Sequence, residues 1–472
     1  MLHMGHILAA LMPYDSSGLE PALSSVVVDS RKVKNGSLFV AFRGEKVDGH
    51  NFVANAFAAG ATAALVEEPL PGNYTIIDTR DPIRPIDFTK PVCIVVESSL
   101  IALQQAAKAW RAKFPAVRII GITGSVGKTT TKELVYTVLK QRYNTLKSAG
   151  NRNNEIGLPL TLLALRPYHQ RAVLEMGMYA PGEIALLCDI AKPDVGVLTI
   201  IGPVHMERVG SMEGIVKAKQ ELVEALPTNG IAILNQDDQR IMSMAQHTKA
   251  PVFTYGLDNQ ADLWANNIDS MGLDGVRFTL HYRGESMTVS VPLLGRHSVH
   301  TALRATAVGL VEGMGWEAII AGLNDDSAGE LRLVAVPGPH NSIIIDDTYN
   351  SSPDSAMAAL NLLDELDGRH VAVLGDMLEL GHMETQSHRL VGRRAAVVAD
   401  ELVAVGQRGR IIADEALTVG MAKKHVHWVA EAPAAIPILE EMIQEQDIIL
   451  IKGSLGMRMD RIVAALGRDK DF

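Results

Sequence analysis

The chain has 472 residues, of which 47% are hydrophobic and 21% charged, a composition typical of folded globular proteins rather than disordered or fibrous ones. The net charge of −10 argues against a nucleic-acid-binding protein, and no apolar run reaches the roughly 18 residues that a membrane-spanning helix needs. The two cysteines, Cys93 and Cys188, have no paired metal-binding spacing and predict no disulfide framework. The length predicts roughly two to four domains.

The chain begins with MLHMGHILAALMPYDSS, an apolar patch without a preceding basic region or a small-residue cleavage site. These features favour a helix of the first domain over a signal peptide. We therefore expect a cytoplasmic protein.

Three segments of the sequence differ in their pattern. Residues 1–100 contain short apolar runs separated by Gly, Asp and Pro, which predict a small α/β domain that ends near the Pro-rich loop DTRDPIRPIDFTKP. Residues 101–323 alternate helix-length and strand-length runs, with a predicted hairpin in which VRFTLHY and MTVSV flank RGES. Residues 324–472 alternate helical stretches with continuous apolar runs such as SIIIDD, HVAVLGD and DIILIKGS. Strands that are apolar on both faces and separated by helices predict a parallel, doubly wound sheet.

The stretch GITGSVGKTTTKE, residues 121–133, is typical of a phosphate-binding loop. Gly127, Lys128 and Thr129 match the end of the pattern G-x-x-x-x-G-K-[ST], but the earlier glycine is Gly124 and the loop is shorter than usual. A predicted strand precedes the loop and a predicted helix follows it, so backbone N–H groups and the helix N-terminus can hold phosphate. We predict an ATP or GTP site in which Lys128 reaches the terminal phosphates and Thr129 binds Mg²⁺. The alternatives are a glycine turn capped by threonines and a switch GTPase, whose N-K-x-D run is absent.

Two further residues are candidates for binding Mg²⁺, which prefers hard oxygen ligands. Glu175 ends the predicted strand AVLEMG, at the sheet edge where α/β proteins bind ligands. His205 lies in the loop IGPVHMERVGS after another predicted strand. A solvated rim carboxylate and an ordinary surface imidazole are the alternative interpretations.

Lys219 stands out on the predicted helix SMEGIVKAKQELVEAL. Its neighbours at helical spacing form an apolar stripe of Ile215, Leu222, Val223 and Leu226, whereas Lys217 lies on the polar face. Burial would lower the pKa of Lys219, and a neutral amine there could take up CO₂ to become an anionic carbamate near Mg²⁺. The alternative is a lysine that snorkels from the edge of the stripe into solvent.

The chain resembles the Mur ligase family over about residues 24–466. It carries, in the order found in that family, the runs TGSVGKTTTKE, NRNNEIGLPLTLL, VLEMGM, KAKQEL, GRHSVHTALRA, IIIDDTYNSSPDS and LGDMLELG. Its N-terminal VVVDSRKVKNGSLFVAFRGEKVDGHNF is similar to the family's UDP-sugar-binding domain. The resemblance implies an α/β protein of three domains: a UDP-sugar-binding domain (1–100), a P-loop ATP-binding domain with a parallel sheet (101–323), and a Rossmann-like domain that binds the incoming dipeptide and ATP (324–472).

Mur ligases are ATP-dependent amide ligases of peptidoglycan precursor synthesis. The runs DDTYN and LGDMLELG are similar to the members that add D-alanyl-D-alanine to UDP-N-acetylmuramoyl-tripeptide, and the D-Y-A-H and D-N-P-R runs typical of the members that add diaminopimelate or lysine are missing. The resemblance implies an acyl-phosphate intermediate and the products UDP-N-acetylmuramoyl-pentapeptide, ADP and phosphate. It also implies ATP and Mg²⁺ as cofactors and a carbamylated Lys219. The implied partners are the small molecules UDP-N-acetylmuramoyl-tripeptide and D-alanyl-D-alanine and no nucleic acid, and the implied oligomeric state is a monomer. Lysine and diaminopimelate are equally compatible as the donor's third residue.

The family's functional residues carry over onto this sequence motif by motif. The implied catalytic residues are Lys128, Lys219, Glu175 and His205. The implied magnesium ligands are Thr129, Glu175, His205 and the carbamate of Lys219. The implied nucleotide contacts are Gly124, Ser125, Val126, Gly127, Lys128, Thr129, Thr130, Asn154, Thr301, Arg332 and Asp347. The implied substrate contacts are Asp29, Ser30, Arg31, Asn151, Asn153, Tyr349 and Asn350.

The sequence also departs from the family pattern. Ser298 and Thr301 replace the two asparagines of G-x-H-N-x-x-N, one of which lies near adenine in the family. Glu330 stands where an arginine is expected, and Arg332 is the expected substitute at the γ-phosphate. Ser352 replaces the second asparagine of Y-N-A-N-P. A ligase with another acceptor and a non-catalytic nucleotide-binding paralogue therefore stay open as alternatives.

Overall fold

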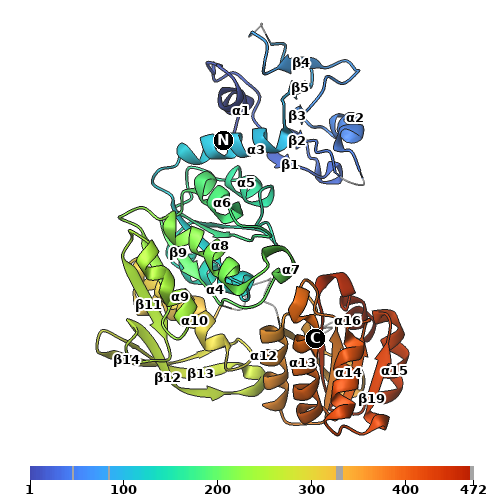
Figure 1. The fold of residues 1–472 in the computed structure, drawn as a ribbon. Coiled ribbons are helices and arrows are strands. Elements are labelled where there is room, and N and C mark those ends of the chain that lie inside the picture. The colour runs from blue at the N-terminus through green and yellow to red at the C-terminus, as the bar shows by residue number, and fades with distance from the viewer. Residues whose placement is uncertain (45–46, 83–85, 326–332, 468–472) are drawn as a thin grey trace.

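The computed structural model describes residues 1–44, 47–82, 86–325 and 333–467, and its strands form three sheets that follow one another along the chain (Figure 1). The predicted α/β class with parallel sheets is confirmed. Glu330 and Arg332 lie outside the described residues.

The first sheet is parallel throughout, with the order β1-β2-β3-β5-β4. Its strands are β1 (Ser25–Val27), β2 (Ser37–Val40), β3 (Ala63–Val66), β4 (Thr75–Asp78) and β5 (Val92–Val95). The accompanying helices are α1 (Met4–Leu11), α2 (Val53–Ala58) and α3 (Ser99–Ala112). The N-terminal apolar patch thus forms a helix, as predicted. The buried side of α3 shares one apolar core with this sheet and with the central sheet, so it joins the first two domains.

The central sheet has the order β14-β13-β12-β11-β10-β9-β6-β8-β7. Its strands are β6 (Arg118–Thr123), β7 (Thr145–Lys147), β8 (Arg171–Glu175), β9 (Val195–Leu198), β10 (Ile231–Asn235), β11 (Val252–Gly256), β12 (Leu263–Ser270), β13 (Val276–Tyr282) and β14 (Glu285–Val291). The predicted hairpin is β13–β14, and the structure adds β12 antiparallel to β13. The other neighbouring strands of this sheet are parallel.

Helices cover both faces of the central sheet because its strand residues alternate between two apolar cores. On β6, Ile119 belongs to the core shared with the first domain, whereas Ile120 and Ile122 belong to the core on the opposite face. The helices of this domain are α4 (Lys128–Leu139), α5 (Gly157–Leu162), α6 (Glu183–Ala191), α7 (Met206–Val209), α8 (Met212–Glu224), α9 (Gln239–Met242), α10 (Ser298–Val311) and α11 (Trp316–Leu323). Helices α4, α10 and α11 pack on the second face, and α5, α6 and α8 pack on the first.

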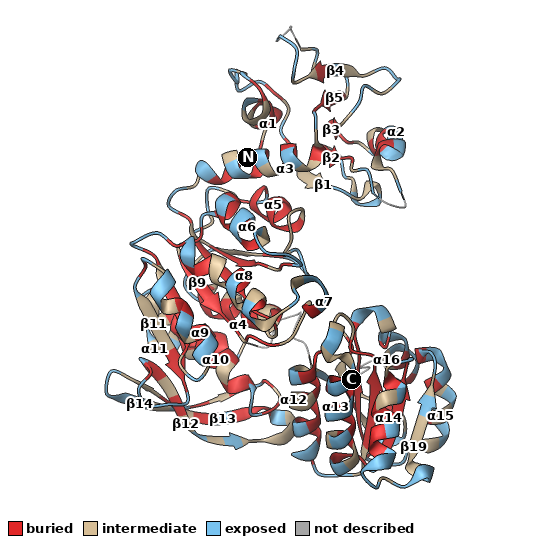
Figure 2. Cartoon of the chain, in the orientation of Figure 1, coloured by how far each residue is buried: buried red, intermediate tan, exposed pale blue. Residues whose placement is uncertain are grey.

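The third sheet has the order β15-β16-β20-β17-β18-β19 and is parallel except for β15, which pairs antiparallel with β16 at one edge. Its strands are β15 (Val334–Pro337), β16 (Ile343–Asp347), β17 (His370–Gly375), β18 (Glu401–Val405), β19 (Val426–Val429) and β20 (Ile448–Lys452). One face is covered by α12 (Pro353–Asp364), α13 (Glu384–Val398) and α14 (Gly409–Thr418), and the other by α15 (Ala435–Met442) and α16 (Asp460–Leu466). Figure 2 shows the buried strands between these half-exposed helices, the arrangement predicted from the continuous apolar runs.

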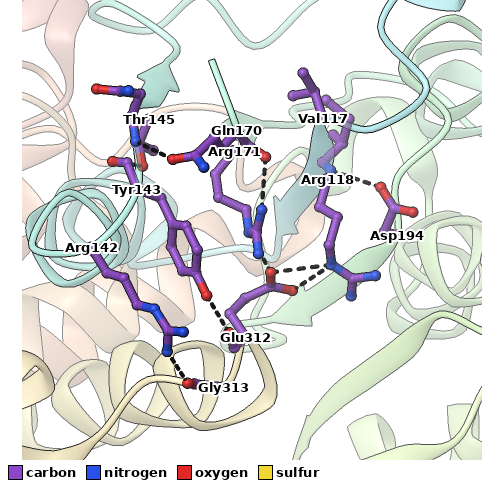
Figure 3. Close-up of polar contacts among 12 residues, drawn as sticks. Val117, Arg118, Arg142, Tyr143, Thr145, Gln170, Arg171, Asp194, Glu312 and Gly313 are labelled. Carbon is purple, nitrogen blue, oxygen red and sulfur yellow. Dashed lines mark hydrogen bonds and ion pairs between the residues drawn. The ribbon is translucent and has the colours of Figure 1, made fainter. Parts of the chain in front are cut away.

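A buried ion cluster fixes the carboxyl end of α10 against the central sheet (Figure 3). The Glu312 carboxylate is fully buried and accepts hydrogen bonds from Arg118 at 2.9 and 3.1 Å and from Arg171. These arginines begin β6 and β8, and the Tyr143 hydroxyl donates to the Glu312 carbonyl oxygen at 2.7 Å. The cluster therefore anchors α10 at the amino edge of the sheet, opposite the edge where β6 runs into the glycine loop.

No helix among the described residues is both long and apolar enough to cross a membrane.

Candidate active site

The glycine loop connects β6 to α4, as predicted. Gly124 has φ +148°, and a Cβ there would lie 1.9 Å from the Thr199 hydroxyl oxygen, so only glycine fits. Gly127 precedes α4 with φ +83°, the left-handed region that glycine adopts without strain. The loop is held by the segment that follows β9: Ser125 N–H donates to the Ile200 carbonyl at 2.6 Å, and the Thr199 hydroxyl donates to the Val126 carbonyl at 2.7 Å.

The two polar side chains at the start of α4 lie at the loop. The Lys128 ammonium donates to the carbonyl oxygens of Gly124 and Ser125 at 2.9 and 3.2 Å, which keeps its charge beside the loop. The Thr129 hydroxyl donates to Glu175 Oε2 at 2.8 Å, and Thr130, on the same first turn, is half-buried. The N-terminus of α4 directs its N–H groups and the positive end of the helix dipole toward the loop, so this end is suited to an anion.

Glu175 is the last residue of β8, and its side chain is buried, so the alternative of a solvated rim residue is wrong. Its second oxygen, Oε1, accepts from Asn153 Nδ2 at 2.8 Å. The strand end thus joins Thr129 and the Asn-rich turn in one polar cluster. Asn154 uses its side-chain oxygen to accept from Gly157 N–H at 2.9 Å at the start of α5, and Asn151 is exposed.

Lys219 is 1% exposed on α8, which rules out the snorkelling alternative. The predicted stripe partners Ile215, Leu222, Val223 and Leu226 are buried with it. Burial lowers the pKa of Lys219 well below its ordinary value, and the charge of Lys128 lowers it further, while Glu221 and Glu175 oppose the shift. Burial therefore shifts Lys219 toward the neutral amine, the form that reacts with CO₂.

His205 is half-buried between two domains and is not an ordinary surface histidine. Its backbone is left-handed, with φ +55°, and its Nδ1 lies 2.5 Å from Glu379 Oε2, which follows β17 in the third domain. Burial lowers the pKa of His205 despite the opposing charge of Glu379, and Lys219 and Lys128 are close enough to lower it further.

Thr129 and Glu175 are in direct contact, and Lys219 and His205 are close enough to feel the charge of Lys128, so the residues around the loop fit a hard divalent cation. They offer a carboxylate (Glu175), a hydroxyl (Thr129), an imidazole (His205) and an amine suited to carbamate formation (Lys219). Within the described part of the chain, three or more His, Cys, Asp or Glu residues never gather in a metal-binding group. A cation at this site would therefore depend on the threonine and the carbamate to complete its shell.

Helix α10 places Thr301 beside the loop, but in an arrangement that the sequence did not predict. The Thr301 hydroxyl accepts from Arg304 Nη2 at 2.8 Å, and the same guanidinium donates to Thr131 on α4 at 3.0 Å. Ser298, the first residue of α10, donates its hydroxyl to the Leu294 carbonyl at 2.7 Å.

Asp347 ends β16 and contacts Lys452, the last residue of β20, with an Oδ2–Nζ distance of 2.6 Å. The same ammonium donates to the Asn350 carbonyl at 2.9 Å, and Tyr349 is half-buried in this loop. A ligand that binds Asp347 thus meets a carboxylate already oriented by a buried lysine, which is 2% exposed.

The predicted UDP contacts lie in the first domain, far from the glycine loop in the sequence. Asp29 precedes the short turn Ser30–Lys32 and accepts from the Arg31 guanidinium through both oxygens, at 2.9 Å each. These hydrogen bonds lower the pKa of Asp29 to about 2. Arg31 is largely exposed, so its outer face is open to an anionic ligand.

Three residues of this region carried no predicted role: Glu379, Lys452 and Arg304. Glu379 lies in the quoted run LGDMLELG, and Lys452 ends a continuous apolar strand, the same signal that identified Glu175. Arg304 had no such signal, because the residues one helical turn before it, His300 and Thr301, are polar and the sequence shows no continuous apolar stripe around it.

Comparison with known proteins follows the same three-part division. The models of the Mur ligase family match the chain in order: "Mur ligase family, catalytic domain" over residues 23–111, "Mur ligase middle domain" over 122–309 and "Mur ligase, glutamate ligase domain" over 332–455. A relative from Bacillus subtilis, named UDP-N-acetylmuramoyl-tripeptide–D-alanyl-D-alanine ligase, is 37% identical over 95% of this chain and 94% of its own length. This chain belongs to the Mur ligase family.

Other Mur ligases are similar over the full length. A relative of the same name from Escherichia coli is 36% identical over 95% of each chain. The crystal structure of MurF from Acinetobacter baumannii has a TM-score of 0.83 at 31% identity, covering 98% of this chain and 97% of its own. That of MurF ligase from Thermotoga maritima in complex with ADP has a TM-score of 0.76 at 28% identity, covering 93% and 96%. The family membership predicted from the sequence motifs is therefore confirmed.

Proposed function

We propose that this Mur ligase uses ATP to join D-alanyl-D-alanine to UDP-N-acetylmuramoyl-tripeptide, giving UDP-N-acetylmuramoyl-pentapeptide, ADP and phosphate for peptidoglycan synthesis. The observation that carries the proposal is the full-length similarity to ligases of that name from Bacillus subtilis and Escherichia coli. The ADP complex of the Thermotoga maritima relative supports the choice of nucleotide.

The glycine loop is the proposed site of the ATP phosphates. Residues 124–130 provide backbone N–H groups at the start of α4, and Lys128 already holds its charge at that place. As the γ-phosphoryl group moves to the donor carboxylate, the Lys128 ammonium would offset the repulsion between two anions. Asn154, Thr301 and Arg332 are further proposed nucleotide contacts.

Thr129, Glu175, His205 and the carbamate of Lys219 would hold Mg²⁺, which when bound supplies Lewis-acid stabilisation of phosphoryl oxygens. The polar cluster of Thr129, Glu175 and Asn153 orients these oxygens before any ligand arrives. The burial of Lys219, which lowers its pKa, supports the carbamate.

The proposed reaction has two steps. The donor's terminal carboxylate first takes the γ-phosphoryl group, which forms an acyl phosphate and releases ADP. The amine of D-alanyl-D-alanine then attacks the carbonyl carbon, loses a proton, and expels phosphate as the amide C–N bond forms. Asn151 and Asn153 of the Asn-rich turn are the proposed contacts near the reacting groups.

The three domains would each bring one reactant. We assign residues 1–100 to the UDP-sugar, with Asp29, Ser30 and Arg31 as contacts, 101–323 to ATP, and 324–472 to the dipeptide and the ATP ribose. Asp347, fixed by Lys452, is suited to accept hydrogen bonds from ribose hydroxyls, and Tyr349 and Asn350 follow it in the same loop. We further propose a cytoplasmic monomer, since the reactants are small and each domain contributes to one site.

The test is phosphate release from ATP by the purified chain with Mg²⁺ and UDP-N-acetylmuramoyl-tripeptide, with and without D-alanyl-D-alanine. We expect release that requires both substrates and a product with the pentapeptide mass. Turnover with other amines but not with D-alanyl-D-alanine would discard the named acceptor. ATP binding without turnover for any pair would discard the enzyme and favour a nucleotide-binding paralogue.

A further inference from the structure

Arg304 is a buried cation without a carboxylate partner among the described residues. Its side chain is among the largest that are fully buried, with 1% exposure. Its guanidinium donates to three hydroxyl oxygens, those of Thr131 at 3.0 Å, Tyr255 at 3.3 Å and Thr301 at 2.8 Å. Burying an uncompensated charge is costly, and hydroxyl dipoles offset only part of that cost. The arrangement is therefore unfavourable unless an anion approaches.

The guanidinium lies directly beside the glycine loop. Its Nη2 is 3.5 Å from the position that a Cβ on Gly127 would occupy, and Thr131 lies on the first turn of α4. Tyr255 extends the contact, because its hydroxyl donates to the Leu198 carbonyl at the end of β9, next to Thr199, which holds the loop. Arg304 is thus linked to the loop region directly through Thr131 on α4 and indirectly through Tyr255, which contacts the end of β9.

The partner residues also account for one departure from the family pattern. Thr301 stands where Mur ligases usually have an asparagine, and here its hydroxyl accepts a hydrogen bond from Arg304. The threonine side chain is shorter than that of asparagine, and its hydroxyl is the hydrogen-bond partner of the Arg304 guanidinium. Among the described residues no ion pair joins Arg304 to a carboxylate, and Asp237 pairs instead with His300 of the same helix at 2.8 Å.

We infer that Arg304 is a positioning residue for the nucleotide, whose buried charge acts through the glycine loop to favour the polyphosphate of ATP. The inference rests on the proposed assignment of the loop. Buried charges interact at an effective dielectric constant of about 20 rather than 80, so an anion several ångströms away is attracted strongly enough to change affinity by about tenfold or more. The phosphates are the anions that this loop would hold, and the attraction grows with their number.

The experiment compares wild type with Arg304→Met, which keeps the volume but removes the charge, and Arg304→Lys, which keeps the charge. Affinities for ATP, ADP and AMP are measured with the full chain by competition against a fluorescent ATP analogue. We expect Arg304→Met to weaken ATP by about tenfold or more, ADP by less and AMP least, and Arg304→Lys to recover most of the loss. Equal weakening of the three nucleotides, or no recovery with lysine, would overturn the inference.

Thermal unfolding without nucleotide supplies a second readout. Replacing an uncompensated buried charge by an apolar side chain of similar size is often neutral or stabilising. We therefore expect Arg304→Met to keep or raise the unfolding midpoint while the rise caused by ATP shrinks. A lower midpoint together with an unchanged ATP-induced rise would mean a purely structural role. If Arg304→Met does not fold, Arg304→Lys and Arg304→Gln give the same comparison of charged against neutral.

The outcome can be separated from a failure of the proposed nucleotide site. Lys128→Ala is measured in parallel, because Lys128 belongs to the loop itself. If Lys128→Ala binds ATP as wild type does, the loop assignment is wrong; if Lys128→Ala loses ATP while Arg304→Met does not, only the inference about Arg304 is wrong.

Discussion

Substituting Gly124 by alanine tests the shape of the phosphate loop most directly. A Cβ at this position would lie 1.9 Å from the Thr199 hydroxyl oxygen and 3.0 Å from the Thr199 Cβ. Overpacking of this kind costs about 1–3 kcal/mol. The backbone conformation, with φ +148°, adds about 1–3 kcal/mol for a residue other than glycine. The loop in its present shape should therefore be disfavoured by at least about 2 kcal/mol, which corresponds to roughly 30-fold weaker ATP binding.

The assay is calorimetric titration with ATP, arranged as a double-mutant cycle with Thr199→Ala. Thr199→Ala alone loses the hydrogen bond to the Val126 carbonyl, worth about 1 kcal/mol, and should weaken ATP binding modestly. In the Gly124→Ala background the same change removes the closest clash, so it should restore part of the affinity. The sign of the Thr199 effect is thus expected to reverse between the two backgrounds.

Gly284→Ala is the matched control. Gly284 also has a positive φ, +82°, but nothing lies within 4 Å of its Cβ position, and it stands between β13 and β14. Alanine there should lower stability slightly and leave ATP binding unchanged. The reasoning would be refuted if Gly124→Ala bound ATP normally, or if Thr199→Ala were equally harmful in both backgrounds.

Three further predictions concern charged residues. Lys128→Ala should lower kcat by at least about 10²-fold in the phosphate-release assay, comparable to the loss of one oxyanion donor, and near-normal turnover would remove Lys128 from the site. Glu312→Ala leaves the partly buried Arg118 and Arg171 without their carboxylate and should lower the free energy of unfolding by about 2–4 kcal/mol in urea titrations. A change below about 0.5 kcal/mol would contradict the role of that cluster. Burial raises the pKa of Glu20, but hydrogen bonds from its surrounding loop outweigh this and bring it to about 2, below its ordinary 4.5. The stabilisation by ionised Glu20 should be complete above about pH 4.5 and lost toward pH 2. The thermal-unfolding midpoints of wild type and Glu20→Gln should therefore converge on acidification. A difference between the two midpoints that does not depend on pH would argue against this role of Glu20.

The sequence was most informative where local pattern and burial coincide. The alternation of apolar strands and helices predicted the class of the fold, because a strand buried on both faces has no polar positions to obscure its pattern. The same logic identified Lys219, since one cation within an apolar stripe is either exposed at its edge or buried, and the structure places it inside. Glu175 was found by its place at the end of a buried strand.

Local sequence patterns could not predict contacts between residues far apart in the chain. The pairing of His205 with Glu379 joins residues 174 positions apart, and no periodicity links the two loops. Strand β12 was not predicted because its sequence, LWANNIDS, is too polar to be recognised as a strand, and its pairing with β13 overrides that weak propensity. Arg304 was missed because its burial depends on hydroxyls from α4 and β11, which only the packed domain brings together.

The contact between His205 and Glu379 also bears on how such a ligase couples its domains. His205 comes from the central domain and Glu379 from the third, and both have positive φ, so their backbones adopt an uncommon conformation at the place where the domains meet. Strained conformations persist only where the surrounding structure holds them. A reaction that needs three reactants gains most from exact alignment, since well-oriented groups reach effective molarities of roughly 10⁵–10⁸ M. A contact that orients a proposed metal ligand only when the third domain is in place would make that alignment a condition for assembling the proposed metal site.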